Sequence, residues 1–168
     1  MANSVGNLDH STFEILASGI RGEIILPSHE KYDQARKIYN GMIDKHPGMI
    51  VQCTDVADVI AAVKFGKEHE LLVAVRGGGH NGGGLGLCDD GMVIDLSGIK
   101  YVIVDQPTGT VRVGGGNTLG EIDHATQAFG LAIPAGIIST TGIGCLTLGG
   151  GVGYLARKYG LTIDNLLE

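Results

Sequence analysis

A single histidine lies in a run of glycines that directly follows an apolar stretch of the sequence. Residues 74–86 read AVRGGGHNGGGLG, with His80 at the centre and Arg76 near the start. Glycine lets the backbone turn sharply and approach a ligand closely, but it brings no reactive group of its own. Successive glycine N–H groups in turn conformations can surround an anion, so residues 77–79 with Arg76 predict a phosphate-binding loop. A glycine-rich surface loop whose histidine has no chemical role is the alternative.

His80 itself is open to three chemical roles: a metal ligand, a proton-transfer group or a nucleophilic ring nitrogen. Metal ions in proteins are usually bound by several His or Cys side chains at short spacings such as HxH, HxxxH or CxxC. No such spacing occurs near His80, so we predict no metal site. The residues alone leave the other two roles, and a purely structural one, undecided.

The same loop also contains the spacing GxGxxG, at Gly77, Gly79 and Gly82, with Asp95 eighteen residues after Gly77. That spacing is typical of dinucleotide-binding folds, where the loop opens into a helix whose N-terminus binds the pyrophosphate. Here residues 82–91, which begin with the last glycine of that spacing, read GGGLGLCDDG, and their five glycines do not favour a helix. We therefore do not expect a dinucleotide-binding fold of that kind.

Two amphipathic helices are predicted before the loop. In residues 31–44 one face recurs at steps of three and four, namely Tyr32, Ala35, Tyr39 and Met42. In residues 54–70 a similar spacing marks a face for the core, namely Val56, Ile60 and Val63. Residues 1–22 are polar and weakly patterned, and we expect a loosely ordered arm with one short helix near residues 13–17.

Strand candidates flank the second of these helices, at residues 49–53 and 71–75. Strand, helix and strand in about 25 residues form a βαβ unit, and a crossover of this kind makes its two strands parallel. The glycine loop therefore follows the carboxyl end of a strand, where open α/β sheets commonly bind ligands.

The pattern changes after the loop. Three short strands follow one another without a helix between them and predict an antiparallel meander: residues 91–97, 101–105 and 110–116. Residues 117–130 predict a helix that begins with a capping box of Thr118 and Glu121 and has Gly130 at its C′ position. The segment that follows is rich in glycine yet apolar, which indicates a packed segment rather than a flexible linker.

Composition limits the classes of protein to which the chain can belong. With 168 residues, of which 43% are hydrophobic, it can bury one substantial core. A net charge of −6 disfavours nucleic acid as a partner. The N-terminus lacks a signal-peptide pattern and no stretch is apolar for long enough to span a membrane, so we expect a soluble, cytoplasmic protein. Three widely spaced cysteines, Cys53, Cys88 and Cys145, favour reduced thiols.

Three parts of the sequence carry a family resemblance: AVRGGGHN, residues 91–136 and residues 140–167. They resemble the FAD-binding domain of the vanillyl-alcohol oxidase type (PCMH-type), in particular the bacterial branch of the berberine bridge enzyme-like oxidases. The similarity runs from Glu23 to the last residue. It implies an α+β, two-lobed fold, with FAD in the crevice between the lobes. The implied parts are an arm over residues 1–22, a small βαβ lobe over residues 23–98, and an incomplete antiparallel-sheet lobe over residues 99–168.

The resemblance also implies a set of FAD-binding residues. In the family the RGGGH loop binds the FAD pyrophosphate, and its histidine, matched here by His80, is joined through a ring nitrogen to the 8α carbon of the flavin. The implied contacts of the loop are Arg76, Gly77, Gly78, Gly79 and Asn81. The implied contacts of a wall along the isoalloxazine ring are Pro134, Gly136, Thr141, Gly142, Gly144, Cys145, Leu148, Gly150 and Val152. A second tether in some members comes from a cysteine whose position matches Ile138, so we expect attachment through His80 alone and not through Cys145.

The activity that the resemblance implies is that of a flavin-dependent oxidase. Such an enzyme transfers hydride from a small organic substrate to FAD and passes the electrons to O2. Relatives carry further strands and a substrate domain that usually supplies the catalytic base, so the chain looks like an N-terminal fragment with no catalytic residue of its own. An oligomer is compatible with the sequence. A hypothesis of another class is a non-redox module that binds a nucleotide or another phosphate.

Overall fold

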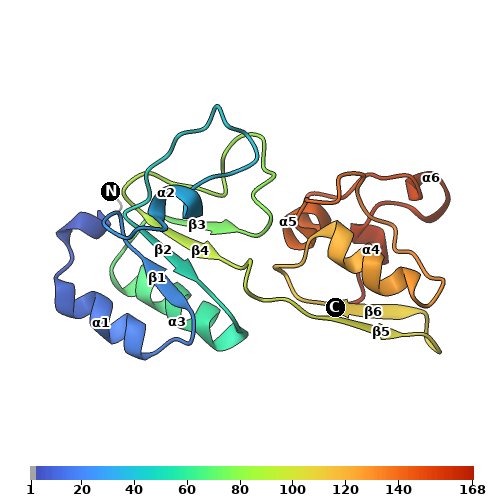
Figure 1. Ribbon diagram of the computed structural model, residues 1–168, viewed down its shortest axis with the longest axis horizontal. Helices are drawn as coiled ribbons and strands as arrows, with labels where there is room; N and C mark the ends of the chain where they lie inside the picture. Colours follow the sequence, from blue (N-terminus) through green and yellow to red (C-terminus); the bar gives the residue numbers. More distant parts are fainter. Residues whose placement is uncertain (1–2) are drawn as a thin grey trace. The chain divides into compact units, whose positions relative to one another are not determined.

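The computed structural model describes residues 3–168, and the chain divides into two units, Met1–Ile99 (unit 1) and Lys100–Glu168 (unit 2) (Figure 1). Unit 1 has buried hydrophobic clusters on its sheet, and unit 2 has a smaller cluster of its own. The glycine loop with His80 belongs to unit 1, whereas the residues expected to form the flavin wall belong to unit 2.

A four-stranded sheet with the order β1-β2-β4-β3 forms the centre of unit 1. Its strands are β1 (Glu23–Ile25), β2 (Met49–Gln52), β3 (Val73–Arg76) and β4 (Met92–Asp95). β2 and β3 both run parallel to β4, whereas β1 pairs antiparallel with β2 at the edge. The carboxyl ends of β2, β3 and β4 therefore lie at the same end of the sheet, and the glycine loop begins there, directly after β3 (Figure 1).

The predicted βαβ unit is confirmed, but the prediction that residues 91–97 belong to an antiparallel meander is wrong. β4 is the inner strand between β2 and β3, and its Met92, Val93 and Ile94 are fully buried. A continuous apolar run is typical of an inner parallel strand, and residues 77–91 are long enough to return the chain to the starting edge of the sheet. Of the three strands predicted for the meander, only the last two, which lie in unit 2, pair antiparallel with each other.

The crossover helix α3 (Val56–Glu68) packs against the sheet with a different face from the one predicted. Its buried residues are Asp58, Ala62, Phe65 and Gly66. The expected core residues Val56, Ile60 and Val63 are instead exposed, each by 50% or more. The helix is rotated because Gly66 fits closely against the sheet and because the Asp58 carboxylate is bonded to the backbone beside it.

Asp58 connects α3 to the start of β1 and to the end of β2. Its carboxylate oxygens accept hydrogen bonds from the N–H groups of Arg21 at 2.8 Å, Gly22 at 3.0 Å and Thr54 at 2.9 Å. The Thr54 hydroxyl donates a further bond at 2.9 Å. Burial favours the neutral acid, but these donors favour the carboxylate and outweigh burial, so the pKa of Asp58 lies below its ordinary value.

Asp58→Asn is expected to lower the free energy of unfolding at pH 7 by about 2 kcal/mol, because an amide cannot replace both carboxylate oxygens as acceptors. A carboxylate whose pKa is lowered by folding stabilises above its unfolded pKa, near about 4, and loses this effect as the pH falls through the folded pKa. Urea unfolding at pH 7 and pH 3 therefore should give a smaller difference between variant and wild type at pH 3. An equal difference at both pH values, or an equal loss in the exposed control Asp123→Asn, would contradict this role.

The N-terminal residues and the segment after β1 both differ from expectation. The short helix predicted near residues 13–17 is confirmed as part of α1 (His10–Ser18), but residues 3–22 are not a loosely ordered arm, because α1 and a 3-10 turn (Val5–Asn7) bury Leu16 and Val5 in the core. The predicted helix over residues 31–44 is wrong, because α2 ends after one turn (Tyr32–Ala35). The chain then leaves the helical path, since its next residues are bonded to the glycine loop; Met42 is 91% exposed.

Unit 2 consists of a β-hairpin covered by a helix, followed by a glycine-rich segment with short helices. The hairpin pairs β5 (Val102–Asp105) with β6 (Thr110–Val113), and helix α4 (Leu119–Gln127) packs on it (Figure 1). The remaining elements are α5 (Ile143–Leu148), α6 (Ala156–Tyr159) and a 3-10 turn (Ile163–Asn165). Leu119, Ile122 and Ile143 form the core. α5 therefore helps to build the core of the unit from within the glycine-rich segment.

The predicted capping box of α4 is confirmed. The Thr118 side chain accepts from the backbone of Glu121, and the Glu121 carboxylate accepts from the Thr118 N–H at 2.8 Å. Gly130 adopts the left-handed conformation expected of a glycine that ends a helix, with φ of 68°, although two residues after the C-cap Ala128 rather than one.

Thr118→Ala is expected to destabilise unit 2 by about 1 kcal/mol, because the N-terminus of α4 loses its side-chain acceptor. Chemical denaturation followed by circular dichroism measures this loss. Gln106→Ala, at an exposed site in the hairpin turn, is the control and should change the stability by less than about 0.5 kcal/mol. An equal effect of both substitutions would argue against the cap.

Candidate functional site

The glycine loop runs from the end of β3 to the start of β4 without forming a helix in residues 77–91. The helix that a dinucleotide-binding fold of the GxGxxG type requires is therefore absent from this part of the chain, as the sequence predicted. Gly79 and Gly84 both have φ of 71°, in the left-handed region that a side chain rarely adopts. These two positions explain part of the glycine content by backbone geometry alone.

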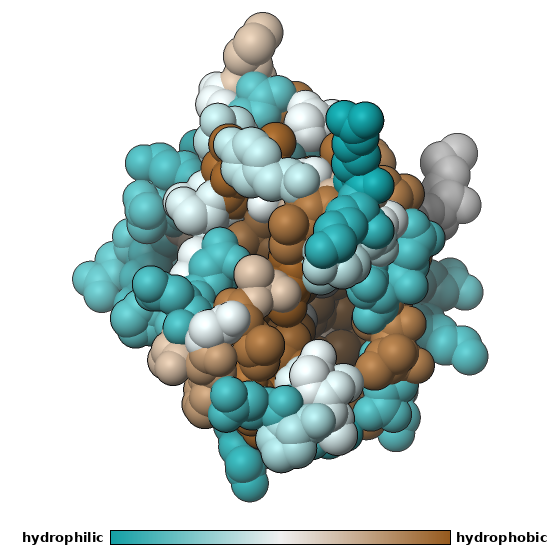
Figure 2. Space-filling view, turned by 90° about the vertical axis from the view of Figure 1, so that its right-hand side faces the viewer, coloured by the Kyte–Doolittle hydropathy of each residue, from teal (hydrophilic) through white to brown (hydrophobic). Residues whose placement is uncertain are grey.

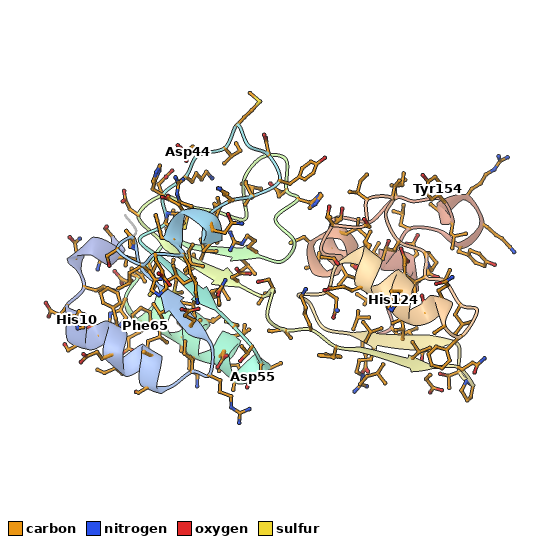
Figure 3. All side chains as sticks on the ribbon, in the orientation of Figure 1. His10, Asp44, Asp55, Phe65, His124 and Tyr154 are labelled. Atoms are coloured by element: carbon orange, nitrogen blue, oxygen red, sulfur yellow. The ribbon has the colours of Figure 1, made fainter. Side chains whose placement is uncertain are left out.

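A supporting segment, residues 38–46, holds the glycine loop by its carbonyl groups. The Tyr39 N–H donates to the Gly79 carbonyl at 3.1 Å, and the Asn40 side-chain amide donates to the Gly82 carbonyl at 2.9 Å. The Lys45 ammonium group donates to two more loop carbonyls, at 3.0 and 3.1 Å. Figure 3 shows Asp44 in this segment, beyond α2. The described contacts of the supporting segment thus leave the N–H groups of residues 77–79 unused, and the loop N–H that the segment does bind, that of Asp90 to the His46 carbonyl at 3.0 Å, lies at the far end of the loop.

The N–H groups at the start of the loop fit a bound anion. The turn hydrogen bonds within residues 77–91 take their donors from Gly84, Leu85 and Leu87, all after His80. None of these described bonds uses the N–H groups of residues 77–79. Glycine N–H groups beside a positive-φ glycine are a common anion-binding arrangement, so the loop has the donor set that a diphosphate needs.

Arg76 lies at the base of the loop and is buried together with Asp95. The two residues are partners in register on neighbouring strands, and a guanidinium N–H donates to the Asp95 carboxylate at 2.5 Å. A second guanidinium nitrogen lies 3.5 Å from the Lys37 carbonyl, which it reaches as a donor. The other oxygen of Asp95 accepts from the Ser97 N–H at 2.9 Å. Arg76 therefore anchors the loop, and its direct contact with phosphate stays a prediction.

His80 is half-buried, and its imidazole stacks on the Tyr39 ring. The ring centroids are 4.2 Å apart and the planes meet at 20°. The Tyr39 side of this pair is open, because Tyr39 is 69% exposed. Next to it, exposed Asn81 accepts the Leu85 N–H through its side chain at 3.0 Å and the Gly84 N–H through its carbonyl at 3.1 Å. Asn81 therefore shapes the turn, and its contact with phosphate stays a prediction.

The wall residues predicted in unit 2 lie on α5 and on the loops that flank it. Gly142 is the N-cap of α5 and forms a β-bridge with Thr118, and the Thr141 carbonyl accepts from the Leu119 N–H at 2.9 Å. An added Cβ on Gly144 would lie 3.2 Å from the Gly115 carbonyl oxygen. Unit 2 thus needs these small residues for its own packing.

The loops on either side of α5 touch each other. An added Cβ on Gly136 would lie 2.5 Å from Leu146 of α5, and one on Gly153 would lie 1.6 Å from the Ala135 carbonyl oxygen. Pro134 and Gly136 are half-buried, as is Gly150, which adopts a φ of 101°. The two ends of the predicted wall therefore form one connected surface within unit 2.

The side chains that this segment exposes are largely apolar. Leu148 is 79% exposed and Val152 is 70% exposed, and Cys145 on α5 is also exposed. Figure 2 shows an area of hydrophobic residues at the surface, bordered by hydrophilic ones, and Figure 3 shows Tyr154 in the segment before α6. An apolar surface with exposed backbone at glycine positions fits a flat aromatic ring system.

The other two cysteines, Cys53 and Cys88, are free and buried, in agreement with the prediction of reduced thiols. Burial raises the pKa of the Cys53 thiol to about 12, with a smaller contribution from nearby carboxylates, Asp58 first. Burial likewise raises the pKa of Cys88. Neither thiol is ionised at neutral pH, and a thiol reacts as its thiolate.

Sequence reasoning missed three residues that organise the loop: Tyr39, Asn40 and the carboxylate of Asp95. The first two were placed in a helix that does not form. Asp95 was weighed only as the acidic residue of a dinucleotide fingerprint. The available signal was that Arg76 and Asp95 each end an apolar strand, where opposite charges on neighbouring strands can pair.

Residues 3–168 were expected to contain no metal site and no membrane-spanning segment. In this part of the chain no three His, Cys, Asp or Glu side chains gather closely enough to hold a metal ion. Among the helices that the structure describes, none has the length and apolar character to cross a bilayer.

The chain is similar in sequence and in structure to known FAD-binding proteins. Residues 47–168 match a family model described as FAD binding domain. An FAD-linked oxidoreductase of Dictyostelium discoideum is 42% identical over 149 residues, which covers 88% of this chain and 32% of that protein. The chain therefore spans about a third of the length of this relative.

Solved structures give the same picture. The crystal structure of 6-hydroxy-D-nicotine oxidase from Arthrobacter nicotinovorans matches with a TM-score of 0.84 and 35% identity, over 86% of this chain and 32% of that one. The wild-type BBE-like 1 protein of Physcomitrella patens matches with a TM-score of 0.84 and 35% identity, over 91% of this chain and 34% of that one.

Proposed function

The chain belongs to the FAD-binding domain family of FAD-linked oxidoreductases, and on that premise we propose that its glycine loop binds the FAD diphosphate and that His80 carries the flavin covalently. The α+β fold of the PCMH type, the family and FAD as cofactor, all expected from the sequence, are confirmed. The individual contacts and the covalent bond are the content of the proposal.

The observation that carries the proposal is the hydrogen bonding of the loop: its carbonyl groups are bound by the supporting segment, whereas the N–H groups at its start are not used in its turns. The supporting segment binds the carbonyls of Gly79, Gly82 and Gly84. The described turn bonds within the loop take their donors after His80, and none of them uses the N–H groups of residues 77–79. A diphosphate carries acceptor oxygens only and matches such a donor set. The Arg76 charge is compensated by Asp95, so the attraction for the diphosphate is proposed to come from the partial positive charges of the backbone N–H groups.

The proposed tether joins a ring nitrogen of His80 to the 8α carbon of the flavin. When this bond forms, the imidazole loses its N–H proton and one 8α C–H bond is broken with loss of a second proton. Bound FAD would pass the two electrons of that C–H bond to dioxygen, which would take up two protons and leave as hydrogen peroxide. An electron-withdrawing imidazole on the ring favours flavin reduction.

In unit 2, the proposed role of the α5 segment is to cover the isoalloxazine ring with the wall residues named above. The exposed Leu148 and Val152 offer apolar contacts to the ring. The exposed thiol of Cys145 is proposed as a contact and not as a second tether.

For the whole protein we propose an oxidase. Bound FAD supplies a two-electron acceptor for hydride from a small organic substrate, with O2 as the final acceptor. The chain spans about a third of the length of its relatives. We therefore propose that the substrate-binding site and the residue that deprotonates the substrate belong to other parts of such an enzyme. A cytoplasmic location stays a prediction.

Titration of the flavin-free protein with FAD, FMN and ADP tests the proposed ligand. Quenching of FAD fluorescence is expected, with ADP as a weaker competitor because it shares only the diphosphate and adenosine. FMN should bind more weakly than FAD because it lacks the second phosphate. Binding of ADP without any binding of FAD would favour a non-redox nucleotide module and would overturn the proposal.

A further inference from the structure

The proposed binding of FAD gives the Tyr39 side chain no role, yet its ring stacks on the imidazole of His80. The centroids are 4.2 Å apart and the planes are 20° from parallel. We propose that Tyr39 is a positioning residue, whose ring sets the plane of the His80 imidazole and so directs a ring nitrogen toward the flavin carbon. The inference rests on the proposed tether, and it assigns to Tyr39 a role in forming that bond.

The backbone on both sides of the stacked pair is fixed by contacts that do not involve the tyrosine ring. The Tyr39 N–H is bonded to the Gly79 carbonyl at 3.1 Å, directly before His80. On one side Ile38 lies beneath Gly79, where an added Cβ would be 3.5 Å from its side chain. On the other side Asn40 is bonded to the Gly82 carbonyl at 2.9 Å. Loss of the ring would therefore leave the loop backbone in place.

Ring orientation matters because of the geometry of the new bond. The lone pair of an imidazole nitrogen lies in the plane of the ring, so the carbon that it attacks must also lie close to that plane. The direction of the ring nitrogens depends on the two side-chain torsions of His80, and attack is productive from a small part of their range. A flat partner parallel to the imidazole restricts the rotation without covering its nitrogen-bearing edge.

The bond that Tyr39 would help to form is the proposed tether, and its formation involves the same protons and electrons. One N–H and one C–H proton are lost, the nitrogen–carbon bond forms, and two electrons reach dioxygen through the flavin. Tyr39 contributes no proton and no electron, since its ring acts through orientation. Phenylalanine should therefore replace it, whereas an aliphatic residue of similar size should not.

The experiment compares the full chain carrying Tyr39→Phe, Tyr39→Leu or Met42→Leu with wild type. All are produced under riboflavin limitation and then mixed with FAD in air. The first readout is the rate at which flavin becomes resistant to acid precipitation. The second is non-covalent FAD affinity from fluorescence quenching. The third is the NMR shift of the His80 ring protons, which a parallel aromatic ring moves upfield and which are assigned by their absence in His80→Ala.

Tyr39→Leu is expected to slow covalent incorporation about threefold to tenfold, the range that an aromatic pair provides. It should also remove the upfield shift and leave FAD affinity within about twofold of wild type. Tyr39→Phe and Met42→Leu should retain both the rate and the shift. Incorporation by Tyr39→Leu at the wild-type rate, with the shift lost, would overturn the positioning role alone. Absence of covalent flavin from wild type that binds FAD would overturn the tether, and this inference with it.

Discussion

Replacing His80 by alanine is expected to abolish covalent flavin while the protein still binds FAD reversibly. The loop keeps its N–H groups and its supporting contacts to Tyr39 and Asn40, because these involve the backbone of Gly79 and Gly82 and not the imidazole. Acid precipitation separates the two kinds of binding. Flavin absorbance should remain in the pellet of wild type and move entirely to the supernatant of His80→Ala.

The matched control for this prediction is His124→Ala, which removes an exposed histidine of α4 in unit 2 (Figure 3). This variant should keep as much acid-resistant flavin as wild type. Acid-resistant flavin in His80→Ala would place the attachment elsewhere, with Cys145 as the exposed nucleophile to examine next. Loss of reversible binding in His80→Ala would instead show that the imidazole is needed for the fold of the loop.

Arg76→Ala is expected to lower the free energy of unfolding by about 3 to 5 kcal/mol, the largest stability effect predicted for this chain. The substitution leaves the Asp95 carboxylate buried with the Ser97 N–H as its remaining donor. The cost arises from an uncompensated buried charge more than from the lost ion pair. Urea unfolding at pH 7 measures it.

Two further variants separate these contributions. Arg76→Met combined with Asp95→Asn removes both charges and should cost less than Arg76→Ala alone. Arg112→Ala breaks an exposed pair with Glu168, whose atoms are 3.0 Å apart, and should change stability by less than about 1 kcal/mol. If Arg76→Ala is no more destabilising than Arg112→Ala, the buried pair does not anchor the loop as the structure indicates.

Features that depend on residues close together in the sequence were predictable from the sequence. The capping box of Thr118 and Glu121 depends on residues three apart, and the structure contains it. The βαβ unit depends on the order of its apolar runs, and β2, α3 and β3 follow that order. The glycine loop was predictable from its run of glycines after an apolar strand, and residues 77–91 contain no helix, as expected from their glycine content.

The errors occurred where distant residues decided the outcome. The valine face of α3 matches a helical period, but Asp58 turns the helix because Arg21, Gly22 and Thr54 donate to it from two other segments. The predicted helix at residues 31–44 is interrupted because Tyr39 and Asn40 bind a loop that lies about forty residues away in the sequence. The prediction of a hairpin strand at residues 91–97 is wrong because the inner position of β4 depends on its pairing with β2 and β3, one on each side.

The candidate site shows the same division. Residue type and spacing were sufficient to choose His80 and the glycines before it. They did not reveal that Arg76 is occupied by Asp95, or that Gly136 and Gly144 are needed for close packing within unit 2. Small residues are used both for ligand approach and for packing, so their identity alone does not separate the two roles.

Mass spectrometry of the tryptic peptide that contains His80 tests the central claim most directly. Cleavage after Arg76 and Lys100 yields residues 77–100, a peptide in which His80 is the only histidine. We expect this peptide to carry the mass of FAD less two hydrogen atoms, with fragment ions that place the addition on His80 rather than on Cys88. An unmodified peptide from protein that retains its flavin after acid treatment would contradict the proposed attachment.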